Sequence, residues 1–240
     1  MKSLLVTLFA ALLPMTAFAA DAPATPKTAH PMKIGIIGTG EIGSALARHW
    51  AAAGHQLLIS SRHPEQLQTL AKELGPNVTV GTPREAAAFG EVVMLAVPYG
   101  ATPQVGRDYA AEMKGKVVLD AGNPYPSRDG EMAVRDRTRG TGVASAEYLP
   151  GTRLVRAFNA INSGPLERDA FRKPERLGIP LAADDPEAMK IAEQLVRDAG
   201  FDPVPVGDLS RAKDFDYGTP VYVQSYTAAR IREMLRLKVN

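Results

Sequence analysis

The 240-residue chain contains no cysteine. This absence excludes disulfides, thiolate zinc sites and a cysteine nucleophile. The histidines, His30, His49, His55 and His63, lack the i, i+4 spacing that places two metal ligands on one helix face, so we expect no metal site. Neither sign of charge dominates, with 28 Lys and Arg against 26 Asp and Glu. This balance gives no electrostatic reason to expect nucleic acid or an anionic membrane as a partner.

The apolar stretch from Leu4 to Leu13 is too short to span a bilayer, which takes about 20 residues. It follows Lys2 and precedes Ala17-Phe18-Ala19, the small-x-small pattern that signal peptidase reads. This order predicts that residues 1–20 are a secretory signal, which would place the protein in the periplasm or outside the cell. An N-terminal amphipathic helix is the alternative. Residues 21–31, rich in Ala, Pro and Thr, are predicted to form a flexible linker.

From residue 33 onward, short apolar runs alternate with helical patterns. Strands are expected at 33–37, 56–60, 78–80, 92–97, 116–120, 153–158, 178–182 and 204–206, and helices at 41–53, 64–74, 83–89, 105–113, 185–199 and 221–237. The alternation predicts an α/β fold, a Rossmann-type doubly wound and mostly parallel sheet. We divide it into a main domain, 32–150, and a small C-terminal α/β extension of the same compact unit, 151–240. Residues 123–142 are expected to form an exposed loop.

A glycine motif, GTGEIG from Gly38 to Gly43, follows the first predicted strand and opens the first helix. In this position the pattern indicates a dinucleotide site. The first glycine allows a tight turn, the second lets the backbone approach a pyrophosphate, and the third lets the helix pack against the strand. The helix N-terminus then presents free N–H groups to the phosphates. A turn without a ligand is the alternative.

No acidic residue lies between positions 44 and 64. An NAD enzyme usually has Asp or Glu about 20 residues past the glycines, where the carboxylate accepts hydrogen bonds from the ribose 2′-hydroxyl. This chain has Ser60, Ser61, Arg62 and His63 at that place. Arg62 can make a charge-assisted contact with a 2′-phosphate, and the serines can donate hydrogen bonds to it. The sequence therefore favours NADP over NAD, with a purely solvated Arg62 as the alternative.

Two further segments end strands at the edge where open α/β sheets bind ligands. Val97-Pro98-Tyr99 follows the fourth strand, and Asn123 follows the fifth. Tyr99 either lines the nicotinamide or substrate side or packs over the sheet. Asn123 either hydrogen-bonds the nicotinamide ribose or carboxamide or serves an Asn-Pro turn.

Residues 33 to about 226 resemble the NADP:deazaflavin oxidoreductase family. The resemblance rests on the segments 34–43, 61–62, 97–99, 155–161 (VRAFNAI), 184–185 and 201–209 (FDPVPVGDL). Ferric-reductase domains of some membrane proteins share this fold, and the Rossmann part is similar to the N-terminal domain of pyrroline-5-carboxylate reductases. The resemblance implies an NADP(H)-dependent oxidoreductase that transfers a hydride to or from a small acceptor, which is a flavin, a deazaflavin, a ferric chelate or a carbonyl compound.

The same resemblance implies roles for single residues. Ser61 and Arg62 would hold the 2′-phosphate, and Ala157 would lie by the nicotinamide. Family members often add a Lys where this chain has Gln66, which suggests weaker NADP binding. Backbone contacts to the pyrophosphate would come from Thr39, Gly40, Glu41 and Ile42.

Direct hydride transfer depends on proximity and water exclusion more than on an acid or base. The sequence shows no convincing proton-transfer pair, and we name no catalytic residue. Asn159, Asn162 and Ser163 either line the acceptor pocket or cap the turn after the sixth strand. Two other functions are a non-catalytic NADP(H)-binding or sensing domain and an exported scaffold that has lost nucleotide binding.

An export signal conflicts with an NADP site, because NADP is not expected in useful amounts outside the cytoplasm. Translation from Met32 would remove the signal and leave a cytoplasmic enzyme. We favour export, because the charge, apolar run and cleavage site occur in the required order. A homodimer formed through the C-terminal helix is a further hypothesis.

Overall fold

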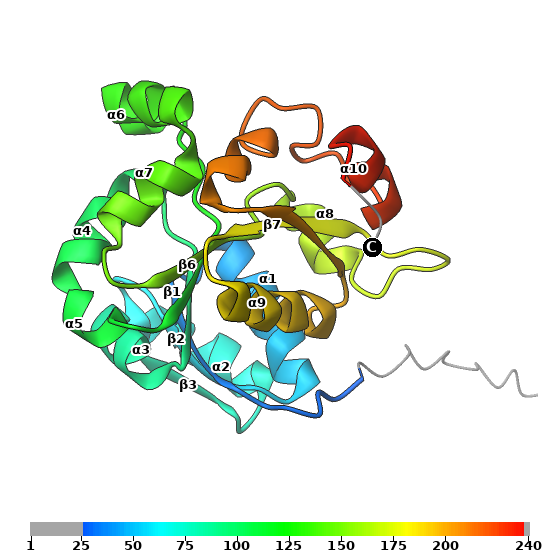
Figure 1. Cartoon of the computed structure of the whole chain (residues 1–240). Coiled ribbons are helices and arrows are strands. Elements are labelled where there is room, and N and C mark those ends of the chain that lie inside the picture. Colours follow the sequence, from blue (N-terminus) through cyan, green and yellow to red (C-terminus); the bar gives the residue numbers. More distant parts are fainter. Residues whose placement is uncertain (1–25, 238–240) are drawn as a thin grey trace, which may run out of the picture.

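The structure is a computed structural model that describes residues 26–237. Its centre is one eight-stranded sheet in the order β3-β2-β1-β4-β5-β6-β7-β8 (Figure 1). Neighbouring strands are parallel except β6 and β7, which are antiparallel. The strands are β1 Lys33–Ile37, β2 Gln56–Ser60, β3 Val78–Gly81, β4 Val92–Leu95, β5 Val117–Asp120, β6 Arg153–Arg156, β7 Gly178–Ala183 and β8 Asp202–Gly207. The predicted Rossmann-type fold is confirmed.

Helices cover both faces of the sheet. One face carries α1 Glu41–Ala53, α2 Gln68–Leu74, α8 Ser163–Arg168 and α9 Pro186–Asp198, and the other carries α3 Pro83–Phe89, α4 Thr102–Asp108, α5 Ala110–Met113 and α7 Thr141–Tyr148. Alternate strand residues serve the two layers: Ile36 packs in the cluster of Trp50, whereas Ile37 packs in that of Ala86. All four residues of β4 are buried, as expected for a strand covered on both faces.

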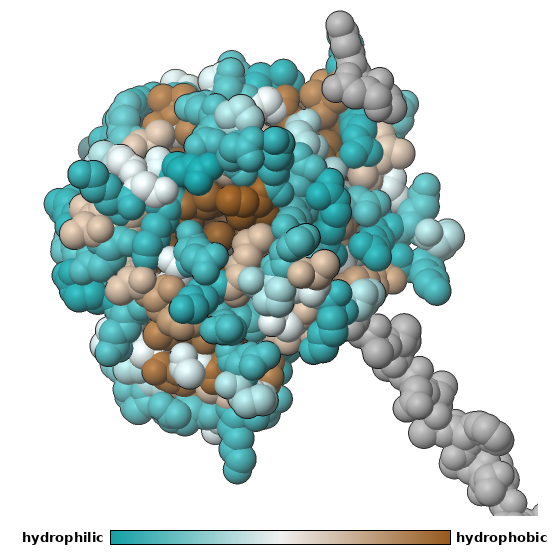
Figure 2. All heavy atoms as spheres, turned by 60° about the horizontal axis from the view of Figure 1, so that its bottom comes forward, coloured by the Kyte–Doolittle hydropathy of each residue, from teal (hydrophilic) through white to brown (hydrophobic). Residues whose placement is uncertain are grey.

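The outer surface is mostly polar. On the face in Figure 2, hydrophilic side chains dominate, and apolar atoms gather in a central hollow with a hydrophilic rim. Within residues 26–237, no helix is both long and apolar enough to cross a membrane.

The exposed loop predicted at 123–142 is wrong, because this stretch contains α6 Pro126–Arg139 and the start of α7. Pro126 is the first residue of α6, where its fixed φ suits a helix. Gly130 interrupts the helix with a φ of 63°. Only Ala133 and Asp136 are buried, so the segment carries no apolar stripe that would mark a helix. In Figure 1, α6 projects from the body of the molecule.

The prediction of a long closing helix at 221–237 is also wrong, because the observed helix is shorter. Helix α10 spans only Ala228–Met234, with Thr227 as its N-cap. Val223 and Ser225 both have a φ of 52°, a left-handed conformation that no α-helix contains. Residues 221–227 therefore run as an irregular segment. The helix predicted at 105–113 is divided at Tyr109 into α4 and α5.

The predicted signal, residues 1–20, lies outside the described residues. The part of the predicted flexible linker that is described, 26–31, is attached to the body. The backbone N–H of Thr28 donates to Ala53 O at 2.8 Å. The side chain of Gln194, on α9, donates to Thr28 Oγ1 and to His30 O, each at 3.3 Å. This stretch is therefore part of the folded structure.

Candidate functional site

A crevice of about 340 Å³ opens at the carboxyl ends of β1, β4 and β5. It lies where the chain order reverses between β1 and β4, which is the usual ligand position in such sheets. Its lining residues are Gly40, Glu41, Ile42, Ala96, Val97, Pro98, Ala121, Gly122, Asn123, Tyr125, Arg128, Phe158, Ile161, Asn162, Ser163, Tyr222 and Val223. The volume is in the range of small-molecule sites.

The three glycines of the motif have three different surroundings. Gly38 has a φ of 96°, and a Cβ there would lie 2.5 Å from Ala96 O. A Cβ on Gly43 would lie 2.0 Å from Gly38 O, so the third glycine permits close packing of α1 on the turn. A Cβ on Gly40 would meet no protein atom within 4 Å. The bare backbone of Gly40 thus borders open space in the crevice.

The N-terminus of α1 fits a pyrophosphate. Its N-cap is Gly40, which has no side chain to cap the first N–H groups of the helix. These donors and the positive end of the helix dipole face the space that Gly40 leaves open. Thr39 is held in place, because its hydroxyl donates to Ser60 O at 2.9 Å. The residues present therefore fit a dinucleotide phosphate.

The end of β2 presents an unpaired cation. Arg62 is exposed, and its guanidinium makes no hydrogen bond or ion pair with any residue in 26–237. Ser61 Oγ accepts from the backbone N–H of His63 at 3.0 Å, so its own proton is left to donate. The His63 ring lies 3.4 Å from Glu65. Arg62 and Ser61 can thus both donate hydrogen bonds to an anion at the end of β2.

Ser60 has another role than predicted. Its side chain is fully buried and donates to Ile36 O at 2.7 Å, so the hydroxyl is not available to a 2′-phosphate. Its carbonyl accepts from the N–H of Gly38 at 3.1 Å. Ser60 therefore fastens the glycine turn to β2.

On the nicotinamide side, Val97 and Pro98 line the crevice, but Tyr99 does not. Tyr99 is fully buried, and its hydroxyl donates to Asp136 at 3.4 Å. Of the two alternatives for Tyr99, packing is the one observed. Ala157 is likewise buried in the core, and Phe158 lines the crevice in its place.

Phe158 has a φ of 60°, an unusual conformation for an aromatic residue. Its ring packs edge-on against Trp50 of α1, with the ring centroids 6.0 Å apart. Such strain tends to occur at functional sites. Here the strained residue lies directly after β6, with its ring in the core beside α1, and it contributes to the lining of the crevice.

Asparagine side chains join the floor of the crevice to β6. Asn123 Nδ2 donates to Asn159 O at 2.8 Å. Asn159 is itself buried, whereas Asn162 and Ser163 line the crevice at the start of α8. The Ser163 hydroxyl donates to Glu41 at 2.6 Å and thereby links the first turns of α8 and α1.

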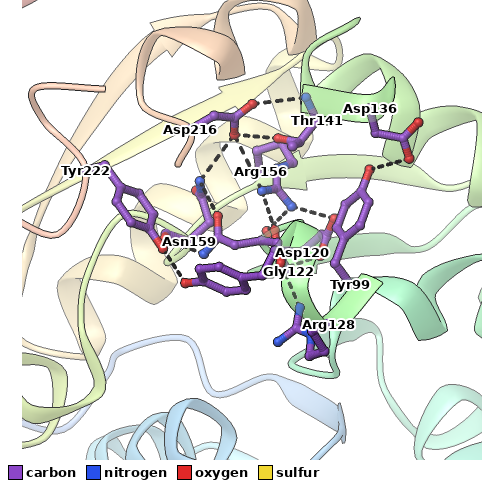
Figure 3. Close-up of polar contacts among 12 residues, drawn as sticks. Tyr99, Asp120, Gly122, Arg128, Asp136, Thr141, Arg156, Asn159, Asp216 and Tyr222 are labelled. Carbon is purple, nitrogen blue, oxygen red and sulfur yellow. Dashed lines mark hydrogen bonds and ion pairs between the residues drawn. The ribbon is translucent and has the colours of Figure 1, made fainter. Parts of the chain in front are cut away.

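A buried charge network lies behind this floor (Figure 3). The guanidinium of Arg156 pairs with Asp120 at 2.5 Å, donates to Gly122 O at 2.7 Å and lies 3.7 Å from Asp216. Asp216 also accepts hydrogen bonds from the backbone N–H and hydroxyl of Thr141. Burial raises the pKa of the Asp216 carboxyl, and Arg156 opposes that rise. The network joins β5, β6 and α7 to the C-terminal segment.

Comparisons with known proteins agree with this geometry. The family model described as "NADP oxidoreductase coenzyme F420-dependent" matches residues 33–124. The F420-dependent NADP reductase of Methanothermobacter marburgensis is 31% identical over 222 residues, 84% of this chain and 95% of that protein. This chain belongs to that family. Its predicted oxidoreductase class and its NADP(H) cofactor are confirmed.

Other similar proteins are more distant or partly matched. A metalloreductase of Rattus norvegicus is 27% identical over 194 residues, 77% of this chain but 36% of that protein. A hypothetical protein from Sinorhizobium meliloti has a solved structure that superposes with a TM-score of 0.72 at 27% identity, covering 82% of this chain and 96% of the other.

Four residues that line the crevice were not predicted from the sequence. Tyr125 and Arg128 lie in the stretch expected to be a loop, and Tyr222 and Val223 lie in the stretch expected to be a helix. Phe158 could have been predicted, since it follows Ala157 in the segment 155–161 that carries the family resemblance. No local sequence pattern indicates that Tyr125 and Tyr222 meet, because their contact joins residues far apart in the sequence.

We expect Arg62→Ala to weaken NADPH binding by about 2 kcal/mol, roughly thirtyfold, because a charge-assisted contact with the 2′-phosphate is lost. NADH lacks that phosphate, so its affinity should change little. Fluorescence titrations of the wild-type protein and of Arg62→Ala with both cofactors measure the effect. Equal losses for NADPH and NADH would refute the assignment.

We expect Gly40→Val to abolish binding of NADPH and NADH, because the new side chain would fill the space of the pyrophosphate. Thermal unfolding should stay near that of the wild type, since no protein atom lies within 4 Å of the added Cβ. Gly43→Val is the contrasting variant and should unfold at a lower temperature, because its Cβ would collide with Gly38 O. Unchanged cofactor affinity in Gly40→Val would contradict the pose.

Proposed function

We propose that this NADP-dependent oxidoreductase transfers a hydride between NADP(H) and an organic acceptor of the deazaflavin or flavin type. The observation that carries the proposal is that the bare Gly40 backbone lines the same crevice as the aromatic and apolar residues Phe158, Ile161 and Tyr222. A planar ring system can pack against such residues beside the nicotinamide. The family's description as F420-dependent supports a deazaflavin acceptor.

The chain's own residues position the two reactants. The first turn of α1 binds the pyrophosphate, and Arg62 with Ser61 binds the 2′-phosphate, which fixes the dinucleotide at both ends of its adenosine half. Val97, Phe158 and Ile161 form apolar walls that exclude water from the reacting rings. Bound NADPH supplies the hydride. Proximity and exclusion of water then provide most of the rate enhancement.

The similarity to metalloreductases supports a second class of acceptor. The metalloreductase relatives suggest that a ferric chelate is reduced instead. The match to them covers only 36% of the rat protein, so it concerns the dinucleotide-binding part of that relative.

The assay is single-turnover oxidation of bound NADPH by coenzyme F420, flavin mononucleotide or ferric-EDTA, followed by NADPH absorbance. We expect oxidation by at least one of the two organic acceptors, because the crevice wall suits a planar ring. Tight NADPH binding without oxidation by any of the three would instead support a non-catalytic sensing domain. The Gly40→Val variant is the control, and it should show no oxidation.

We propose further that residues 1–20 direct export. The order of charge, apolar run and cleavage site supports this. The contacts of Thr28 and His30 with the body favour a chain that begins before Met32, since both residues precede it. Isolation of the protein from cells should then yield an N-terminus near residue 20, measured by mass spectrometry of the intact chain. A chain that starts at Met32, or one that retains residues 1–20, would disprove it. A homodimer stays a hypothesis, to be measured by light scattering.

A further inference from the structure

Two tyrosine hydroxyls meet at the crevice. Tyr125 follows β5, and Tyr222 lies in the irregular segment before α10. Their hydroxyl oxygens are 2.6 Å apart although 97 positions separate the residues, and Figure 3 shows the hydroxyl of Tyr222 in this contact. Both side chains line the crevice. The topology therefore creates a pair of O–H groups where sequence reasoning found no proton-transfer pair.

The pair is held in a fixed position. The ring of Tyr217 packs edge-on against both tyrosines, with centroid distances of 5.1 Å and 5.3 Å. The guanidinium of Arg128 lies 5.0 Å from the centre of the Tyr125 ring. The N–H of Val223, next to Tyr222, donates to Ala160 O at 2.9 Å. Two rigid phenols at a crevice provide a directional hydrogen-bonding site.

Two hydroxyls have two hydrogens, and their mutual hydrogen bond uses one. No other hydrogen bond in residues 26–237 involves either hydroxyl. One O–H hydrogen is thus left for a ligand in the crevice. Burial, together with the hydrogen bond to Tyr125, raises the pKa of Tyr222, so this phenol stays protonated at neutral pH.

The other titratable residues that line the crevice are less suited to give a proton. Glu41 accepts a hydrogen bond from Ser163, as a carboxylate does. Arg128 is paired with Asp129 at 2.8 Å, and this contact raises the pKa of its guanidinium. Ser163 also has an O–H, but Glu41 accepts its hydrogen. Among the described lining residues, the tyrosine pair therefore holds the O–H hydrogen that no described protein atom accepts.

We propose that the Tyr125–Tyr222 pair hydrogen-bonds the acceptor and gives it the proton of the reaction. The inference rests on the proposed function and narrows it to a conjugated two-electron acceptor with a C=N or C=O group. The acceptor's electrophilic atom gains a hydride from NADPH, which becomes NADP⁺, and its oxygen or nitrogen gains a proton from one hydroxyl. The phenolate left behind takes a proton from water. One-electron reduction of a ferric chelate requires no such proton.

The test compares Tyr125→Phe and Tyr222→Phe with Tyr109→Phe, a matched loss of one hydroxyl from a residue that does not line the crevice. We expect the first two variants to reduce flavin mononucleotide or coenzyme F420 about a hundredfold more slowly in single turnovers, the usual contribution of a positioned proton donor. The solvent deuterium isotope effect on that step should change with them. Tyr109→Phe should keep the wild-type rate and isotope effect.

Equilibrium binding provides a second readout. Titration of the NADP⁺-loaded protein with oxidised flavin mononucleotide or coenzyme F420 should show about threefold to tenfold weaker binding in the two crevice variants, the range for one lost hydrogen bond. Their NADPH affinity should stay within about twofold of wild type, well below a 1.4 kcal/mol change.

The outcomes are separable. Wild-type rates of organic-acceptor reduction in both Phe variants would overturn the inference and leave the proposed function intact. Reduction of ferric-EDTA alone by the wild-type protein, or tight NADPH binding with no reduction at all, would overturn it too. Failure of the wild-type protein to bind NADPH would remove the proposed function itself, and the inference with it.

Discussion

The crevice depends on the buried guanidinium of Arg156. This side chain is fully enclosed and pairs with Asp120 of β5, while Asp216 approaches it from the C-terminal segment. Removing either partner would leave a charge buried without compensation, which is strongly unfavourable. A buried ion pair adds little net stability. Here it ties β5, β6 and the C-terminal segment together, because the Arg156 guanidinium lies 2.5 Å from Asp120 and 3.7 Å from Asp216. That arrangement brings the segment with Tyr222 over the ends of the parallel strands.

The half of the site that binds the dinucleotide could be predicted because it is local. Gly38, Gly40 and Arg62 follow strands that short apolar runs predict, and a few neighbouring residues indicate the role of each turn. The sequence predicted less accurately which side chains of this half face the crevice. Ser60 points into the sheet, and Phe158, whose backbone is left-handed, contributes to the crevice lining where Ala157 does not.

The half that receives the acceptor could not be predicted, for a physical reason. Tyr125 precedes a helix with almost no buried face, so hydrophobic periodicity does not reveal its surroundings. Tyr222 lies in the segment 221–227 (VYVQSYT), where weak helix formers precede the helical residues and Val223 and Ser225 adopt left-handed conformations. Tertiary contacts hold this segment, since the Val223 N–H is hydrogen-bonded to Ala160 O and the Tyr222 hydroxyl to that of Tyr125.

This division bears on how the family can vary its substrates. The proposed cofactor half is one continuous stretch, residues 33–62, with the open backbone of Gly40 and the exposed side chain of Arg62. The acceptor half comes from separate segments that meet through the charges of Arg156, Asp120 and Asp216 and through contacts such as that of Tyr125 with Tyr222. Substitutions within residues 216–227 can therefore change the acceptor without disturbing the glycine turn. Family membership consequently assigns the hydride carrier more firmly than it assigns the acceptor, and the side chains opposite the nicotinamide determine what is reduced.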